Sequence, residues 1–153
     1  MATPNYNSFS FEQYPIKDVE SLKIGIVKTE WNPEIISKLE SSCMKTLFDL
    51  GIKKENVEVF TVPGSYELPL GTKYLLGSNL KPNAVICLGC VIQGETKHDD
   101  YINHTIARSI AQIGLVSSIP VMFGVLTTNT LEQALARAGG DHGNKGEECA
   151  LGA

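Results

Sequence analysis

The sequence predicts an α/β fold, a three-layer sandwich in which a four-stranded parallel sheet is flanked by helices. Short apolar segments rich in β-branched residues alternate with segments whose apolar residues recur every three or four positions. These are the periods of buried strands and of amphipathic helices. The chain has 153 residues, 42% of them hydrophobic and 20% charged, which suits one domain with a single core. We therefore expect one domain over residues 1–153, in which residues 1–20 form an N-terminal arm.

The segment LKIGIVKT, residues 22–29, is predicted to be the first buried strand. A helix should follow, with Asn32 capping its free backbone N–H groups and Pro33 at its first position. Gly51 should end this helix. The apolar stripe of the helix consists of Ile36, Leu39, Cys43, Leu47 and Leu50.

Three further strands are expected, in NVEVFTV (56–62), AVICLGCVI (84–92) and PVMFGVLT (120–127). Helices should lie between them, one from about residue 67 to 76 and one after the polar turn that follows the third strand. The second of these helices carries isoleucines at 102, 106, 110 and 113 on one stripe. Since strands and helices alternate, we expect the strands to be parallel and buried on both faces.

A later helix is predicted in NTLEQALARAGG. Asn129 is expected to cap it, Glu132 lies three residues later, and Gly139 should end it. The last segment, residues 144–153, is expected to begin one more helix that spans little more than a turn and buries little surface.

Composition narrows the functional classes. A net charge of -4 and a pI near 5.4 argue against a surface that binds nucleic acid or an anionic membrane. No apolar run approaches the roughly 20 residues of a membrane span, and the N-terminus does not have the pattern of a secretory signal, so a cytoplasmic location is expected. Cys87 and Cys90 form a C-x-x-C inside an apolar strand, without a second ligand pair, which favours packing over a metal site.

Polar segments follow all four predicted strands: KTEWN, VPGSYE, QGETKHDDY and TTNT. Because the carboxyl ends of parallel strands share one edge, these segments should converge there. A turn that leads into a helix presents free N–H groups to an anion, and His98 can exchange protons near neutral pH. By this pattern alone, His98 is more often a solvated turn residue than a catalytic one.

Three stretches carry a resemblance to a known family. VPGSYELPL, GCVIQGETKHDDYI and PVMFGVLTTNTLEQALARAGGDHGNKG closely resemble the signature stretches of the lumazine synthases, and the similarity runs from about Ile24 to Cys149. The resemblance implies a flavodoxin-like topology. It also implies condensation of 5-amino-6-ribitylaminouracil with 3,4-dihydroxy-2-butanone 4-phosphate, without a metal or another cofactor.

The resemblance assigns roles to individual residues. His98 would be the general acid and base, and Glu95, Thr96 and Arg137 would bind the phosphate, Glu95 through its N–H group. Phe123 and Lys145 would come from a neighbouring subunit. The residues implied for the aminouracil are Trp31, Asn32, Ser65, Tyr66, Glu67, Val91, Ile92, Phe123 and Lys145.

The family also implies a homo-oligomer, a pentamer or an icosahedral shell of pentamers, with active sites between subunits. Riboflavin synthase is a candidate partner, and the N-terminal arm is expected to add a strand to the sheet of a neighbour. One departure concerns Asp99, which stands where relatives usually carry phenylalanine or tyrosine. It would either raise the pKa of His98 or loosen its packing.

Two alternatives stay open at this level. One is a catalytically weak paralogue retained as a shell or as a flavin-binding carrier, which only Asp99 supports. The other is a flavodoxin-like electron carrier, which shares the fold class. Its phosphate loop after the first strand is rich in serine and threonine, whereas here the segment is KTEWNPE, so this alternative is disfavoured.

Overall fold

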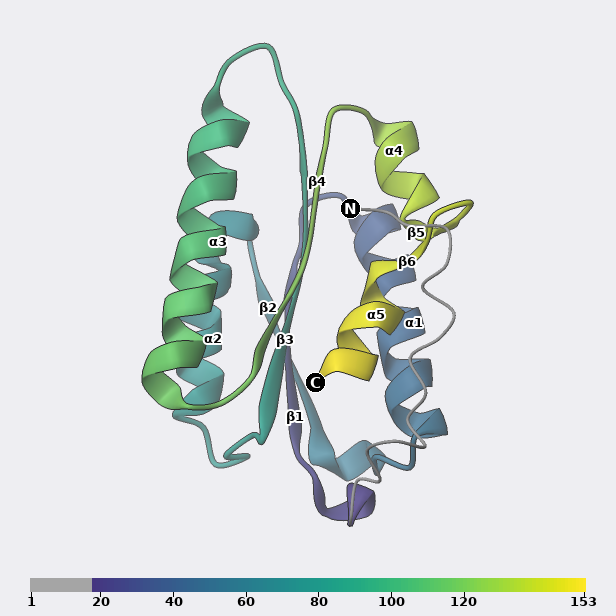
Figure 1. Ribbon diagram of the computed structural model, residues 1–153, viewed down its shortest axis with the longest axis vertical. Helices are drawn as coiled ribbons and strands as arrows, with labels where there is room; N and C mark the ends of the chain where they lie inside the picture. Colours follow the sequence, from purple (N-terminus) through teal and green to yellow (C-terminus); the bar gives the residue numbers. More distant parts are fainter. Residues whose placement is uncertain (1–17) are drawn as a thin grey trace.

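Four parallel strands form the central sheet, in the order β2-β1-β3-β4. The structure is a computed structural model, and it describes residues 18–153. The strands are β1 (Ile24–Thr29), β2 (Val57–Val62), β3 (Ala84–Ile92) and β4 (Val121–Thr128). Their carboxyl ends lie at one edge of the sheet, at the top of Figure 1, which confirms the predicted parallel sheet.

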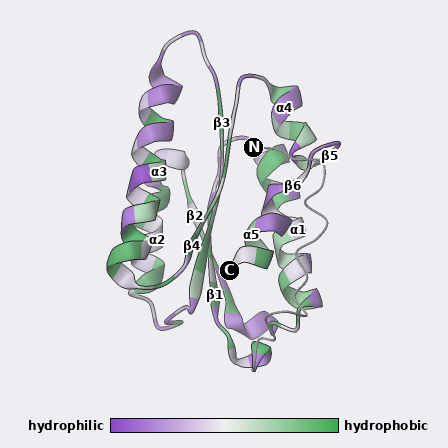
Figure 2. Cartoon of the chain, viewed as in Figure 1, coloured by the Kyte–Doolittle hydropathy of each residue, from purple (hydrophilic) through white to green (hydrophobic). Residues whose placement is uncertain are grey.

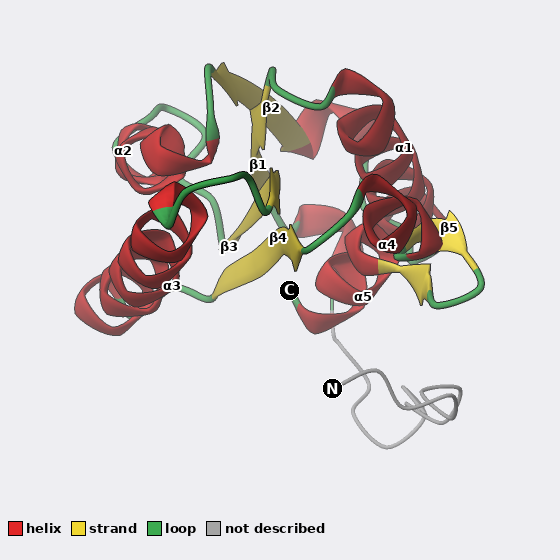
Figure 3. Ribbon diagram, turned by 90° about the horizontal axis from the view of Figure 1, so that it is seen from above, coloured by secondary structure: helices red, strands yellow, loops and turns green. Residues whose placement is uncertain are grey.

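Helices cover both faces of this sheet, as Figure 3 shows from above. On one face lie α2 (Leu68–Leu76) and α3 (His98–Ser117). On the other lie α1 (Pro33–Asp49), α4 (Leu131–Ala136) and α5 (Lys145–Gly152). The single-turn helices are η2 (Val19–Ser21), η3 (Lys54–Asn56) and η4 (Ser65–Glu67). This is the predicted three-layer sandwich. The prediction for the N-terminal arm falls mostly outside the described residues.

The core divides into two clusters, one on each face of the sheet. Ile26, Ile86 and Leu88 pack with α1 residues such as Leu39, while Val27 and the neighbouring strand residues pack with α2 and α3. Strand β3 is the centre of both clusters because its first seven residues are buried. A strand covered on both faces reads as a continuous apolar run, which is why AVICLGCVI stands out in the sequence.

Strand β2 departs from the expectation that every strand is buried on both faces. It lies at one edge of the sheet, and residues 58–61 are exposed. An edge strand has a hydrogen-bonded neighbour on one side only, so its outer backbone and side chains face outward.

Apolar side chains are also exposed on α3. Leu115 and Val116 belong to its last turns, which Figure 2 shows as hydrophobic.

Both predicted asparagine caps are wrong. Asn32 precedes α1 with φ 59° and makes no capping hydrogen bond. Helix α4 is capped one residue later than expected, because the Thr130 hydroxyl accepts from the N–H of Gln133 at 3.3 Å. The side-chain Oε1 atom of Gln133 in turn accepts from the N–H of Asn129 at 2.9 Å. Thr130 and Gln133 therefore supply the capping side chains that were expected from Asn129 and Glu132.

Helix α4 ends at Ala136, before the predicted Gly139. The chain then forms a short antiparallel hairpin of β5 (Ala138–Gly140) and β6 (Gly143–Asn144), which the sequence analysis missed. Gly139 and Gly143 have φ of 106° and 78°, a region that favours glycine. Gly139 thus lies within β5, where the end of the preceding helix was expected, and Gly143 is the first residue of β6.

Helix α5 is longer and better packed than predicted. The Asn144 side chain caps it by accepting from the N–H of Gly146 at 2.8 Å. Gly146, Cys149 and Ala150 are buried, and a Cβ atom at Gly146 would lie 2.0 Å from the Leu39 carbonyl oxygen of α1. The expectation that this helix buries little is therefore wrong, because the missing side chain lets two helix backbones approach closely.

The four cysteines are buried free thiols, which confirms the packing interpretation of the C-x-x-C. Burial raises the pKa of Cys43 and of Cys87 to about 12, and that of Cys90 and Cys149 to about 11.

Within residues 18–153 there is no cluster of three or more histidine, cysteine, aspartate or glutamate side chains suited to a metal ion. No helix in that range has both the length and the hydrophobicity needed to cross a membrane.

Candidate active site

The loops after β1 and β2 are joined by backbone hydrogen bonds. The N–H of Glu30 donates to the Val62 carbonyl at 2.9 Å, and the N–H of Trp31 donates to the Pro63 carbonyl at 3.3 Å. The Thr29 hydroxyl donates to the carbonyl of Trp31 at 3.3 Å, which adds a hydrogen bond within the loop after β1. The indole of Trp31 is 72% exposed, so this fixed loop presents a large apolar ring at the carboxyl edge of the sheet.

Asn32 connects this loop to the end of β3. Its side-chain Nδ2 donates to the carbonyl of Cys90 at 3.1 Å, a contact that spans 58 positions in the chain. The left-handed backbone of Asn32 turns the side chain toward β3 and away from α1, which explains the missing helix cap. Asn32 is thus a structural link between two of the loops that carry predicted site residues.

The PGSYE segment after β2 forms the tight turn of η4. The Glu67 carboxylate accepts from the N–H of Gly64 at 3.0 Å and closes the turn. Ser65 is buried against β3 at Gly89, where a Cβ atom would approach the Ser65 Oγ atom to 2.9 Å. Tyr66 is 60% exposed. Ser65 therefore lies inside the turn, while Tyr66 extends from it.

The loop after β3 leads into α3 and carries the predicted phosphate ligands. Val91 and Ile92 are half-buried at the end of the strand, and Glu95, Thr96 and His98 are exposed. Within residues 18–153, the backbone N–H groups of Glu95 and Thr96 donate no hydrogen bond. His98 is the first residue of α3. Free N–H groups next to a helix N-terminus suit an anion.

Asp99 follows His98 in the first turn of α3 and is half-buried. No hydrogen bond or ion pair joins Asp99 to His98, and Asp99 has no such partner elsewhere in the described chain. Side chains one position apart on a helix point in different directions. Asp99 and His98 are therefore neighbours in sequence that no side-chain hydrogen bond or ion pair joins.

The predicted residues fall into two groups. The strand-end group comes from the loops after β1, β2 and β3, and consists of Trp31, Asn32, Ser65, Tyr66, Glu67, Val91, Ile92, Glu95, Thr96 and His98. The β4-side group consists of Phe123, Arg137 and Lys145, on or after the strand at the opposite edge from β2.

The β4-side group is spread over both faces of the sheet. Phe123 is half-buried in the middle of β4, opposite Cys87, and packs against the core cluster on the α2 and α3 face. Arg137 and Lys145 flank the hairpin on the other face, and the Lys145 N–H donates to the Arg137 carbonyl at 2.9 Å. The Lys145 ammonium contacts the Glu148 carboxylate at 2.8 Å.

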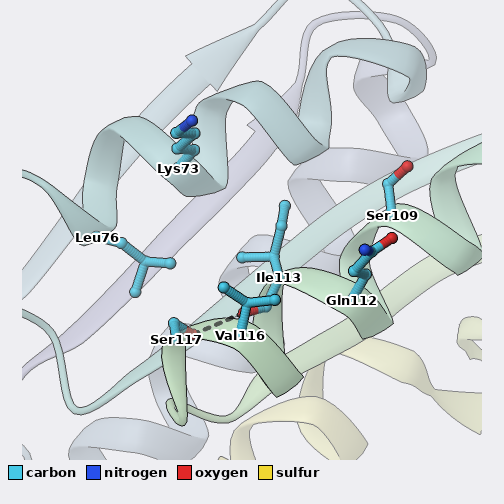
Figure 4. A pocket seen from close by; sticks show the side chains of 7 residues that line it. All are labelled: Lys73, Leu76, Ser109, Gln112, Ile113, Val116 and Ser117. Carbon is cyan, nitrogen blue, oxygen red and sulfur yellow. Dashed lines mark hydrogen bonds between the residues drawn. The ribbon is translucent and has the colours of Figure 1, made fainter.

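Two surface depressions lie away from the strand-end group. One, of about 460 Å³, lies between the end of β4 and α4 and is lined in part by Arg137 and His142. The other, of about 400 Å³, lies between α2 and α3 and is lined by residues that include Lys73, Ile113 and Val116 (Figure 4). Neither contains a residue of the strand-end group.

Sequence reasoning missed two features beside the predicted site. Gly89 leaves the space that Ser65 occupies. In the sequence, this close approach is indicated by a glycine inside a strand of otherwise larger residues. His142 was left without a role, although the hairpin brings it beside Arg137. The glycines on either side of Asp141 and His142 are the only sequence signal for that turn.

Comparisons with known proteins agree with this geometry. The model of the 6,7-dimethyl-8-ribityllumazine synthase family matches residues 21–153. Proteins named 6,7-dimethyl-8-ribityllumazine synthase are similar over most of the chain. The one from Phocaeicola vulgatus is 42% identical over 151 residues, which are 99% of this chain and 89% of that protein. The one from Bacteroides fragilis is 47% identical over 130 residues, 85% and 90% of the two chains. The one from Cytophaga hutchinsonii is 46% identical over 150 residues, 98% and 92% of the two.

Proposed function

The chain belongs to the 6,7-dimethyl-8-ribityllumazine synthase family, and from that membership we infer its reaction and the roles of its residues. It condenses 5-amino-6-ribitylaminouracil with 3,4-dihydroxy-2-butanone 4-phosphate to 6,7-dimethyl-8-ribityllumazine, a step of riboflavin biosynthesis. Phosphate and water are released, and no cofactor takes part. Family membership sets aside the alternative of an electron carrier.

His98 is the general acid and base of this reaction. An amine attacks a ketone, an imine forms with loss of one water, and phosphate is eliminated. The ribitylamino nitrogen then attacks the second carbonyl, and the ring closes with loss of a second water. Each step moves a proton, and an imidazole both accepts and donates protons near neutral pH. The exposed position of His98 at the start of α3, next to free N–H groups, supports this role.

The phosphate is bound by donors from both groups of residues. The N–H groups of Glu95 and Thr96 lie beside the α3 N-terminus and have no acceptor in the described chain, so they are available to an anion. The Thr96 hydroxyl adds a donor. Arg137 makes no ion pair or hydrogen bond through its side chain within residues 18–153, and its planar guanidinium matches two phosphate oxygens.

The aminouracil is held by the loops after β1, β2 and β3. Trp31 stacks on the pyrimidine ring, and its 72% exposure supports a surface that a ligand covers. Ser65, Tyr66 and Glu67 bind the ribityl chain and ring atoms, because a polyol needs several fixed donors and acceptors. Asn32 holds the loop to β3 and touches the same ligand, while Val91 and Ile92 line the ring edge.

The active site lies between two subunits of a pentamer, with the strand-end group from one and Phe123, Arg137 and Lys145 from the next. The placement of those three residues along the β4 side of the subunit supports a split site. Exposed apolar side chains, such as Leu115 at 83% and Val116 at 80%, support association of subunits, because such groups gain free energy when they are buried.

Further parts of the proposal concern the whole assembly. Pentamers pack into an icosahedral shell, the protein acts in the cytoplasm, and riboflavin synthase is a candidate partner. The family resemblance supports these points. Light scattering of the full-length protein and of a variant without the residues before Val19 tests the shell. Loss of the larger particle on deletion is expected, and a monomeric full-length protein would refute the assembly.

A complementation experiment tests the split site. His98→Ala and Arg137→Ala proteins are each expected to form lumazine slowly. After the two are unfolded together and refolded, some sites combine an intact His98 from one chain with an intact Arg137 from another. Activity of the mixture well above that of either variant supports a site shared by neighbours. Activity no higher than the average of the two would place both residues in one subunit.

A further inference from the structure

The depression beside Arg137 contains a histidine that has no role in the site described above. Its lining comes from the end of β4, from α4, from Arg137 and from His142. We propose that His142 is a second ligand of the phosphate ester and acts with Arg137 across the subunit interface. This inference rests on the proposed function, and it extends the phosphate site by a specificity-determining residue.

Backbone hydrogen bonds fix His142 beside Arg137. The N–H of His142 donates to the carbonyl of Ala136, the last residue of α4, at 2.9 Å. The N–H of Lys145 donates to the Arg137 carbonyl at 2.9 Å, so the β5–β6 hairpin is joined to the end of α4 both at its turn and directly after β6. Arg137 and His142 are five positions apart in the sequence, yet the turn places both at the rim of one depression.

The charges around the depression suit an anion at the end that holds these two residues. Glu132 is an acidic lining residue, and it lies in the first turn of α4. Hydrogen bonds from its own backbone N–H and from the Thr130 side chain lower the pKa of Glu132. Arg137 lies at the opposite end of that helix, and Asp141 is not part of the lining.

The two side chains offer complementary donors. A guanidinium presents two parallel N–H groups to a phosphate, which leaves the third oxygen for another donor. An imidazole has one N–H when neutral and two when protonated, so it can donate in either state. His142 is exposed and forms no side-chain hydrogen bond within residues 18–153, and its ring is therefore available to a ligand.

Substitution of His142 tests the inference without disturbing the hairpin, because its structural hydrogen bond comes from the backbone N–H. His142→Ala should raise the KM for the butanone phosphate about tenfold to a hundredfold, the loss of one hydrogen bond to a charged group. The inhibition constant of inorganic phosphate should rise by the same factor, while kcat and the KM for the aminouracil stay nearly constant. His142→Gln, which retains an N–H donor, should recover part of the loss.

His104→Ala is the matched control, since His104 is an exposed histidine on α3, away from this depression. Light scattering must show the same particle for all variants. A His142→Ala enzyme with unchanged phosphate inhibition, with equal loss for both substrates, or with altered assembly would overturn the inference.

A different result would refute the proposed function: the unaltered protein would form no lumazine. Thermal unfolding with inorganic phosphate tests His142 independently of turnover. Phosphate should raise the melting temperature less in His142→Ala than in the unaltered protein. An equal rise in the two proteins would overturn the role of His142.

Discussion

The strand-end group and the β4-side group are held by different parts of the chain. Three loops carry the strand-end group, and hydrogen bonds link these loops to one another, as from Trp31 to Pro63 and from Asn32 to Cys90. The β4-side group depends on an edge strand and on a hairpin that closes onto the end of α4. The two groups thus differ in what holds them: linked loops for the strand-end group, and an edge strand with a hairpin for the β4-side group. Under the proposed function, one subunit would preorganise the aminouracil and proton-transfer side, and its neighbour would supply the added charge.

Loss of His98 should have the largest effect and would test the chemical role of the strand-end group. His98→Ala is expected to lower kcat by roughly tenfold to a thousandfold with little change in either KM, because general acid and base catalysis contributes about 10²–10⁴ and water partly substitutes. Steady-state kinetics measures both constants. His104→Ala should leave them unchanged, and a His98→Ala enzyme with unchanged kcat would remove His98 from the mechanism.

Loss of Arg137 should weaken binding of one substrate and leave the other unaffected, which would distinguish the roles of the two groups. Arg137→Ala is expected to raise the KM for the butanone phosphate by about tenfold to a hundredfold, because hydrogen bonds to a charged group contribute about 1.5–3 kcal/mol. The KM for the aminouracil should stay nearly constant. Arg108→Ala, on the exposed surface of α3, is the control. Equal weakening of the two substrates would contradict the division between the groups.

Trp31→Ala should produce the converse pattern. Removal of the stacked ring is expected to weaken binding of the aminouracil by about 1–3 kcal/mol, the scale for a base stacked on an aromatic side chain. Isothermal calorimetry with a ribityl-pyrimidine analogue measures the change directly. Trp31→Phe should retain part of the affinity, since it keeps an aromatic face. Unchanged binding by Trp31→Ala would exclude a stacking role.

Gly146→Ala should perturb the β4-side group through packing alone. The added Cβ atom would lie 2.0 Å from the Leu39 carbonyl oxygen, so α5 must shift away from α1. Such overpacking costs about 1–3 kcal/mol of unfolding free energy. Denaturant unfolding measures it, with Gly94→Ala as the control because no atom lies within 4 Å of its added Cβ. Equal stability of the two variants would contradict the close helix contact.

Local sequence patterns account for the alternation of strands and helices and for the burial of β3 on both faces. Burial on both faces leaves a continuous apolar run, and helices on one face of a sheet leave a period of three or four, so both signals are local. The predicted bounds of β3 match the structure because AVICLGCVI is flanked by polar residues. The proposal of His98, Ser65 and Trp31 as site residues rests on their place after strands and on family motifs.

The partners of competing polar side chains depend on how distant segments pack together. Asn32 and Asn129 each have the chemistry of a helix cap, but Asn32 binds the Cys90 carbonyl across the sheet and Thr130 caps α4. The hairpin beside Arg137, the space that Gly89 leaves for Ser65 and the approach of α5 to Leu39 likewise depend on segments far apart in the sequence. Local patterns specify the spacing of apolar residues in a segment, and so whether it forms a strand or a helix. These contacts depend instead on which distant backbone or side chain lies within hydrogen-bonding or van der Waals distance after the layers pack.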